Sequence, residues 1–469
     1  MEKKTFRIIP VLGIGIYLVA LLAIDLVFRG HAMEPLFHLW GLGEVLFFFV
    51  LTWFFYHRWS NDDPKRFWCK VFFTALGLRM LYAFLTCYYF YYQTGIPFEY
   101  GAGDSLGYHR LAVKLSRAVR VGYFGYPFKY LFATTMGFSD SGYTLWLTLI
   151  YSIFGPNVLV PRLFKGLMSA YMCIAIYKLT SRTFDEKTGR LAGVMSVFLP
   201  IFIQISGLHT KECELIFLSV MALERMDYLI RSKKYTFWNI FFPILLTALT
   251  FGFRTVTGMC LIFAFLVFIV LSTKDLVHVK SKIIAVSAVV VVFFAFLFSP
   301  IGREMKIVNR LKFTDIDYQS EKFEKLGMEH SGLAKNIYMV PGAFVMPMAS
   351  MVDVSNGNQK MLNGSVYVKN FLAFFAMLAI VIAFRERKWR NFSLVGAYEL
   401  SYLAIIMFSF AFNSERYHEP AIPMIIVMAA YAITHLQKKD VKYMYIYSGL
   451  LLVALVGWNW LKLSARGLI

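Results

Sequence analysis

Runs of about twenty apolar residues recur along almost the whole sequence, separated by short polar connections. Each run is long enough to cross the ~30 Å hydrocarbon layer of a bilayer as an α-helix. Aliphatic, aromatic and Cys residues make up 58% of the 469 residues, which is more apolar surface than one soluble core can bury. The sequence therefore predicts an all-α polytopic membrane protein. We place about thirteen spans, near residues 8–28, 38–56, 68–92, 158–180, 190–207, 212–230, 236–252, 256–272, 283–300, 367–384, 392–411, 421–436 and 442–461.

Basic residues are concentrated in alternate connections between these spans, and the connections between them are nearly bare. By the positive-inside rule, the N-terminus and all the basic connections are expected in the cytoplasm. The net charge of +20 is spread over these short connections, so it indicates membrane topology and no nucleic-acid partner. The basic groups are Lys3/Lys4/Arg7, Arg58/Lys65/Arg66, Lys178/Arg182/Lys187/Arg190, Arg231/Lys233/Lys234, Lys274/Lys280/Lys282, Arg385/Arg387/Lys388/Arg390 and Lys438/Lys439/Lys442.

The spans and long connections divide the chain into four expected parts. Residues 1–67 hold two N-terminal spans, 68–300 a transmembrane core with an outer loop at 93–157, 301–368 a second outer loop, and 369–469 the C-terminal spans. In the first loop, Arg110 and Lys114 recur at helical spacing opposite apolar residues, which predicts an amphipathic helix at the membrane interface. The second loop holds a short apolar stretch that we expect to be interfacial or re-entrant.

Charged residues at the outer boundary are the candidates for chemistry, because placing them near hydrocarbon costs free energy. Asp104 lies between Gly101, Gly103 and Gly107, which allow close approach of a ligand to the backbone. Asp104 is also well placed simply to cap the helix that follows it.

Further outer charges lie at the ends of four spans. Lys211, Glu212 and Glu214 form a polar island that is either a functional group or an ordinary helix start. A single outer Arg is able to extend to headgroups, but several Arg beside outer acids favour a shared anionic ligand. The remaining members of this group are Arg162, Arg254, Arg416 and Tyr417.

Other chemistries fit the sequence poorly. The nine His residues show no H-E-x-x-H spacing, and there is no G-x-x-x-x-G-K-[ST] or G-x-S-x-G motif, which argues against a zinc hydrolase, an ATP-driven pump and an α/β-hydrolase. The five Cys lie singly in or beside apolar runs, as small hydrophobic residues do.

The order of these features resembles the GT-C superfamily of polyprenyl-phosphate-dependent membrane glycosyltransferases, in particular the protein O-mannosyltransferase and lipid A aminoarabinose transferase branch. Asp104 with Tyr108 matches the acidic residue of the family's first outer loop, and Glu212 or Glu214 matches its second outer acid. The resemblance covers about residues 68–255 and the region 411–430. The other matching segments are Gly142–Trp146, Phe154-Gly155, Val160–Leu163, Tyr177–Phe184, Pro200, Ser206-Gly207 and Glu415–Pro420.

Two departures from the family pattern bear on the subfamily. The family's first-loop acidic pair appears here as Asp104-Ser105, so the second acid is missing unless Glu99 replaces it. Two extra spans also precede the span that would be the family's first.

The resemblance implies transfer of a sugar from a polyprenyl-phosphate donor to a glycan, lipid or protein acceptor, with inversion, at the periplasmic face of a bacterial inner membrane. Asp104 is then expected to be the base and Glu212 to orient the acceptor or a cation. A divalent metal near these two acids is compatible with the spacing and not required by it. A glycan polymerase or ligase and a lipid-linked sugar transporter are the alternatives. The expected phosphate and headgroup ligands are Tyr108, Arg110, Lys114, Arg162, Lys211, Arg254, Arg416 and Tyr417.

Overall fold

The structure is a computed structural model that describes residues 3–133, 137–272, 279–280, 282–283, 287, 340–353, 357–408 and 415–469. The predicted span 283–300 falls almost entirely outside these residues, as does the part of the second outer loop from 301 to 339. In the part that is described, the chain is helical, and its only bridge between extended residues joins Ala32 and Val352.

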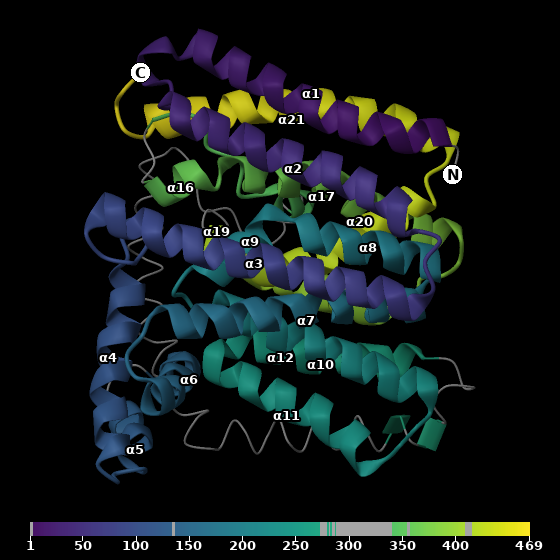
Figure 1. The fold of residues 1–469 in the computed structure, drawn as a ribbon. Helices are drawn as coiled ribbons and strands as arrows, with labels where there is room; N and C mark the ends of the chain where they lie inside the picture. Colours follow the sequence, from purple (N-terminus) through teal and green to yellow (C-terminus); the bar gives the residue numbers. More distant parts are fainter. Residues whose placement is uncertain are drawn as a thin grey trace.

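Most helices run side by side and form one bundle (Figure 1). Each predicted span outside 283–300 coincides with one of its helices or, at 190–207, with a bent pair. The bundle helices are α1 (Lys3–Val27), α2 (Pro35–Trp59), α3 (Pro64–Thr94), α7 (Leu159–Thr183), α8 (Glu186–Phe198), α9 (Pro200–Gly207), α10 (Glu212–Ser232), α11 (Phe237–Phe253), α12 (Thr255–Leu271), α17 (Asn363–Arg385), α18 (Ser393–Phe408), α20 (Ile422–Thr434) and α21 (Lys438–Ser464). The short elements between them are η1 (Arg29–His31), α15 (Val340–Val345), α16 (Gly357–Met361), α19 (Glu415–His418) and η4 (Glu419–Ala421).

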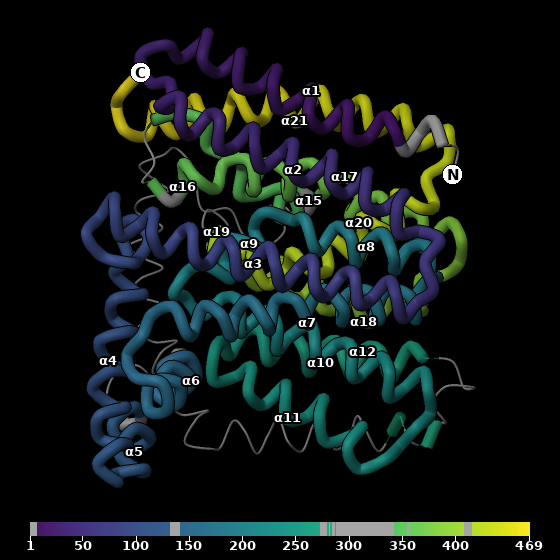
Figure 2. The backbone as a smooth tube through the Cα atoms, viewed as in Figure 1, coloured from purple at the N-terminus to yellow at the C-terminus, as the bar shows by residue number. Residues whose placement is uncertain are grey.

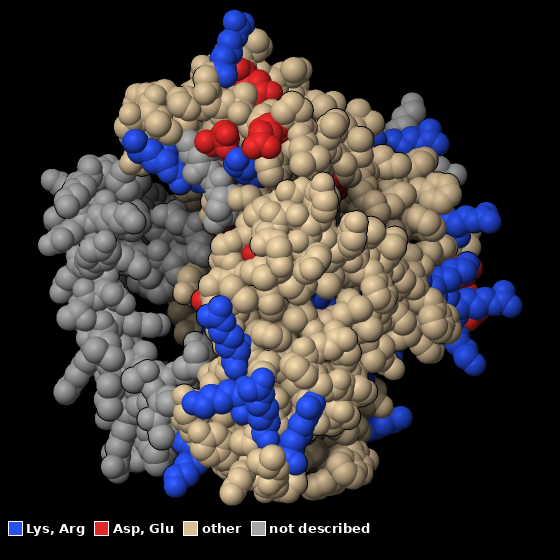
Figure 3. Space-filling view, turned by 60° about the vertical axis from the view of Figure 1, so that its left-hand side comes forward, with Lys and Arg blue, Asp and Glu red and all other residues tan. Residues whose placement is uncertain are grey.

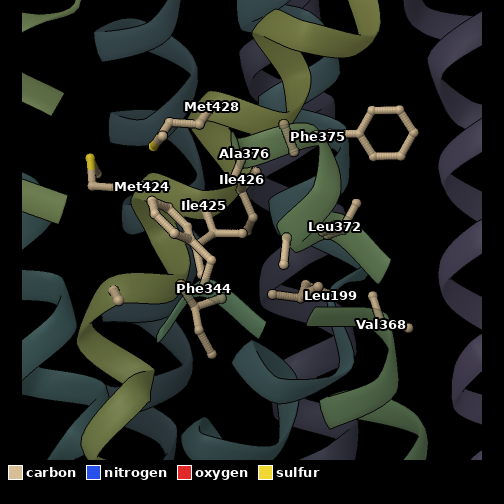
Figure 4. Close-up of a cluster of buried hydrophobic side chains, with 14 of the residues drawn as sticks. Leu199, Phe344, Val368, Leu372, Phe375, Ala376, Met424, Ile425, Ile426 and Met428 are labelled. Atoms are coloured by element: carbon tan, nitrogen blue, oxygen red, sulfur yellow. The ribbon is translucent and has the colours of Figure 1, made fainter. Parts of the chain in front are cut away.

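Six of the described helices are long and apolar enough to cross a bilayer, or seven if the bent pair α8 and α9 counts as one span. This confirms an all-α membrane protein, whereas the number of about thirteen spans stays a prediction. The core of the bundle is apolar and tightly packed. Figure 4 shows Ala376 of α17 beside Ile426 of α20 among these buried side chains.

Three helices lie at one end of the bundle. Figures 1 and 2 show α4 (Gly103–Arg120) running crosswise to the bundle helices, with α5 (Tyr126–Ala133) and α6 (Gly137–Phe154) beside it. The basic connections α2–α3, α7–α8 and α10–α11 lie at the opposite end. The end that bears α4 is therefore the one that the charge pattern predicts to be the outer side.

A bend between α8 and α9 positions one wall of this outer end. The two helices meet at 47° where Pro200 begins α9. Pro200 has no N–H for the preceding turn, so carbonyls at the end of α8 need other donors. The buried guanidinium of Arg79 from α3 supplies them, donating to Ser196 O at 3.0 Å and Val197 O at 3.2 Å. Arg79 thus fixes the direction in which α9 leaves the bend.

Replacing Arg79 with Met is expected to destabilise the protein, because Met fills a similar space but removes the Arg79 donor from the carbonyl of Val197 and leaves that of Ser196 with only the weak thiol donor of Cys173. Each unsatisfied buried carbonyl costs about 1–3 kcal/mol. We expect the Arg79→Met protein to unfold at a temperature several degrees lower in detergent. Arg66→Met is the control, since Arg66 is an exposed residue of the same helix. Equal unfolding temperatures for the two variants would contradict this role.

Candidate active site

Asp104 lies at the start of α4, on the outer end of the bundle. The chain reaches it through Gly101, whose φ of +64° is a conformation that favours glycine. The N-cap of α4 is Ala102, and Asp104 is the second residue of the helix. Its carboxylate, 63% exposed, does not cap the helix; it pairs with Arg416 from the far end of the chain, at 2.6 Å between Oδ2 and Nη1.

Arg416 joins two carboxylates that come from different parts of the sequence. Besides Asp104, its guanidinium contacts Glu212 Oε1 through Nε at 3.1 Å and Nη2 at 2.9 Å. Glu212 is buried at the first turn of α10. The carboxylates on either side, Glu212 foremost, raise the pKa of Arg416 further above its ordinary value, despite an opposing effect of burial, so this Arg stays charged.

Arg254 approaches the same carboxylate from another direction. It lies at the junction of α11 and α12, and its Nη2 is 3.5 Å from Glu212 Oε1. Its Nη1 donates to the hydroxyl of Tyr402 at 3.4 Å, and its guanidinium lies 5.1 Å from the ring centre of Tyr417. Tyr402 in turn donates to the carbonyl of Tyr417 at 2.9 Å. The two Arg, Glu212 and the two Tyr therefore form one connected cluster.

Lys211 adds a third cation next to Glu212. It is the buried N-cap residue of α10. Burial first and the charge of Arg254 second lower the pKa of its ammonium group to about 8. This Lys is therefore a cation whose charge changes near physiological pH.

Glu419 is a further carboxyl group that the sequence reasoning did not single out. It lies in η4, is buried, and its Oε2 has no hydrogen-bond partner within the described segments. Burial, and then the negative charge of Glu212, raise the pKa of Glu419 well above its ordinary value. The two buried carboxyl groups thus differ: Glu212 is paired with two Arg, whereas the surroundings of Glu419 favour its protonated form.

A cavity of about 270 Å³ opens beside this cluster. Asp104, Arg416 and Glu419 line one part of it. The rest of the wall is largely apolar and comes mainly from α3, the turn before α4, α9 with the residues after it, and the junction of α16 and α17. The other lining residues are Tyr82, Phe90, Glu99, Gly101, Ala102, Gly103, Gln204, Ile205, Leu208, Thr210, Met361 and Leu362.

The remaining predicted residues lie outside the Arg416–Glu212–Arg254 cluster. Arg110 and Lys114 are exposed on α4, where Lys114 lies 4.5 Å from the ring centre of Tyr130. Figure 3 shows basic side chains gathered over the part of this end where α4 and α5 lie. Tyr108 is buried with its ring centre 5.0 Å from that of Tyr143. Arg162 is also buried and donates to the carbonyl of Pro97.

Glu99 and Glu214, the two acids that the sequence offered as alternatives for family positions, have different surroundings. Glu99 lines the cavity, where its Oε1 accepts a hydrogen bond from the Ser105 hydroxyl. Glu214 is not among the residues that line the cavity and pairs with the buried Lys165, at 3.5 Å. Glu99 is therefore the acid that lies with Asp104 on the cavity wall.

A metal ion finds no ligand set in this part of the structure. Across the residues that are described, no three His, Cys, Asp or Glu side chains lie close enough together to hold one. Glu212 instead forms ion pairs with two Arg residues, Arg254 and Arg416.

The fold and the site together define a helical membrane protein with an ion-paired carboxylate cluster beside a cavity at one end of its bundle. Residues 142–301 match the family model described as dolichyl-phosphate-mannose-protein mannosyltransferase. The match confirms the predicted resemblance to GT-C glycosyltransferases. It includes Arg162, Lys211, Glu212 and Arg254, while Asp104 and Arg416 lie outside it.

Three solved structures of the Archaeoglobus fulgidus oligosaccharyltransferase are similar to the chain. The apo form is 17% identical with a TM-score of 0.47, the complex with an inhibitory peptide and a dolichol-phosphate 14% with 0.46, and the form tethered with an acceptor peptide containing the NVT sequon 15% with 0.48. Each comparison covers 87% of this chain and 56% of the other, so the chain spans little more than half the length of these proteins. A comparison with curated protein sequences gives no match.

Proposed function

We propose that this protein is a membrane glycosyltransferase that moves a sugar from a polyprenyl-phosphate donor to a glycan, lipid or protein acceptor. The observation that carries the proposal is the arrangement of Asp104, Arg416 and Glu212 beside the cavity, at the end of the bundle that bears α4. This end is the periplasmic side in the proposed topology, with the N-terminus and the basic connections in the cytoplasm.

The cations of the site are suited to a lipid-linked phosphate. As the bond between the anomeric carbon and the phosphate oxygen breaks, negative charge grows on the departing phosphate. Arg416, Arg254 and Lys211 supply positive charge from three segments, and a guanidinium is able to bind two phosphate oxygens at once. Arg110 and Lys114 on the exposed face of α4 are placed to contact lipid headgroups in the same leaflet.

Asp104 is the proposed base for the acceptor. Its carboxylate is exposed and lines the cavity, so an acceptor hydroxyl is able to reach it. It takes the proton of that hydroxyl while the acceptor oxygen bonds to the anomeric carbon and the polyprenyl phosphate leaves with the bonding electron pair. Attack on the face opposite the phosphate inverts the anomeric centre. Glu212 holds the two Arg in position, and Glu99 takes the place of the family's second acid.

The test is a transfer assay with the purified full chain in nanodiscs. Polyprenyl phosphates that carry radiolabelled mannose, glucose or aminoarabinose serve as donors, with a membrane extract as the source of acceptors. Labelled product that depends on the protein supports the proposal. Nanodiscs have no inside, so a transporter would give no product. Conversion of lipid-linked oligosaccharide chains into longer chains, without use of the monosaccharide donors, would instead favour a polymerase.

The affinity for the donor is expected to fall as the pH rises above about 8, because Lys211 then loses its proton. The sign follows from linkage: an anionic ligand favours protonated Lys211, so affinity is full below the lowered pKa and is lost above it. A polyprenyl-phosphate sugar is a phosphodiester whose charge does not titrate in this range. We expect the dissociation constant, measured between about pH 7 and 9, to rise several-fold in the wild type and to stay nearly constant in Lys211→Arg. The same slope in both proteins would contradict the assignment.

A further inference from the structure

Gln204 of α9 presents a fixed hydrogen-bond acceptor at the cavity wall. The side chain is only 4% exposed and lines the cavity. Its Nε2 donates to Met361 O at 3.2 Å and to Glu44 Oε1. Both partners are acceptors, so the amide nitrogen must face them and the oxygen is held on the other side. That oxygen, Oε1, is buried and has no hydrogen-bond partner within the described segments.

Glu44 fixes the orientation of this amide from α2. Besides Gln204, its carboxylate accepts from Trp40 Nε1 at 3.1 Å and from the backbone N–H of Ser365 at 2.8 Å. Glu44 does not line the cavity itself. The three donors come from three helices, α2, α9 and α17, and together they fix the orientation of the Glu44 carboxylate. The fixed carboxylate in turn fixes the orientation of the Gln204 amide.

The packing of α2 on α17 makes this arrangement rigid. A Cβ atom on Gly364 would lie 2.3 Å from the carbonyl oxygen of Gly41, so the two backbones touch at a point that only glycine allows. Tyr17 of α1 donates to Asn363 in the same turn of α17. The two N-terminal helices, which precede the matched family segment, are thereby joined to the cavity wall.

An unpaired acceptor in a buried wall is costly unless a ligand supplies a donor. Ile205, Leu208, Met361 and Leu362 are apolar residues of the same wall, whereas Asp104 and Arg416 are an ion pair in the lining. A ligand with an anionic group for Arg416 and a neutral hydroxyl group for Gln204 would match both the charged part and the uncharged part of the cavity wall. A sugar joined to a lipid phosphate has this chemistry.

We infer that Gln204 determines specificity by accepting a hydrogen bond from a hydroxyl group of the donor sugar, and that Glu44 is a positioning residue that holds the amide for this contact. The inference rests on the proposed function and adds which part of the substrate the cavity wall recognises. It also gives the two N-terminal helices a role in substrate selection.

The test compares lipids with and without a sugar. Dissociation constants are measured for the full chain in nanodiscs with bare polyprenyl phosphate and with polyprenyl phosphates that carry mannose, glucose or aminoarabinose. Gln204→Met keeps the length of the side chain and removes the acceptor. It is expected to weaken binding of at least one sugar-bearing lipid about fivefold to tenfold, the effect of one neutral hydrogen bond, and to leave the bare lipid unchanged.

Two variants of α2 test the role of Glu44. In Glu44→Gln, one accepting oxygen replaces two. The new NH₂ then faces either the backbone N–H of Ser365 or the donors of Trp40 and Gln204, and either donor-to-donor contact shifts the group that holds the Gln204 amide. We expect the same sugar-specific loss, about threefold or more. The control is Thr52→Val, since Thr52 is a buried polar residue of α2 whose hydroxyl has no partner within the described segments. It is expected to bind all four lipids like the wild type.

The outcomes separate the two proposals. If the wild type binds bare polyprenyl phosphate but Gln204→Met weakens no sugar-bearing lipid more than the bare one, the role of Gln204 is wrong and the proposed function stands. If the wild type binds none of the lipids, the proposed function fails and this inference fails with it. Thermal unfolding of each variant shows whether it is folded, and a destabilised Gln204→Met is replaced by Glu44→Gln for the same comparison.

Discussion

Asp104→Asn is expected to lower the rate of sugar transfer by about 10²–10⁴-fold, the range found when a general base is removed. The amide keeps the shape of the carboxylate but does not accept the proton of the acceptor. Binding of the donor is expected to change little, because Asn still accepts a hydrogen bond from Arg416. The measurement is initial transfer rate in nanodiscs, together with the dissociation constant for the donor.

The control for Asp104→Asn is Asp353→Asn. Asp353 is an exposed carboxylate that pairs with Lys360 and does not line the cavity. It is expected to leave the rate unchanged. Transfer by Asp104→Asn at the wild-type rate would show that another group takes the proton, and Glu99 would be the first to examine because it lines the same cavity.

Arg416→Met is expected to abolish measurable transfer and also to destabilise the protein. It removes one of the two Arg that neutralise the buried Glu212 and separates Asp104 from that group. Weakening the pairing of a buried carboxylate costs about 1–3 kcal/mol. The stability change is measured by thermal unfolding and the activity by the transfer assay.

A second substitution distinguishes stability from catalysis. In the double variant Arg416→Met with Glu212→Gln, the buried carboxylate is gone but Arg254 also loses its carboxylate partner, so only part of the lost stability is expected to return. Transfer is expected to stay absent, because the phosphate still lacks its Arg. Recovery of transfer along with stability would mean that Arg416 serves only to fold the site.

The positions of the spans follow from the sequence because their signal is local. A run of apolar residues has to be long enough to cross the bilayer, and each such run within the described residues forms a helix. The α8–α9 break was less visible. Residues 190–207 were predicted as one span, although Pro200 lies within it, and Arg79 appears in the sequence only as a charge inside an apolar run.

The candidate site was predictable to the extent that its residues share one side of the membrane. Asp104, Glu212, Arg254 and Arg416 all follow or begin spans at the outer boundary, and the structure brings these four together. Their pairing was not predictable, because it depends on which helices are neighbours in the bundle.

The residues that sequence reasoning missed have no distinctive local pattern. Glu419 before a Pro looks like an ordinary acid at a helix start, and Gln204 and Glu44 are single polar residues within apolar runs. Gln204 and Glu44 belong to one hydrogen-bond network that joins α2, α9 and α17. Such contacts between segments more than 150 residues apart leave no trace in spacing.

The pairing of Asp104 with a residue 312 positions later has a consequence for biosynthesis. At ~5–20 residues per second, a ribosome needs roughly 15–60 s to make the intervening chain. During that interval Asp104 and Glu212 already belong to inserted or inserting segments, and Arg416 has not been made. Until Arg416 is made, Glu212 is either solvated or paired with Arg254 alone. Its final burial follows insertion of the last helices. A nascent chain halted before residue 415 therefore holds the acids of the site without the cation that joins them.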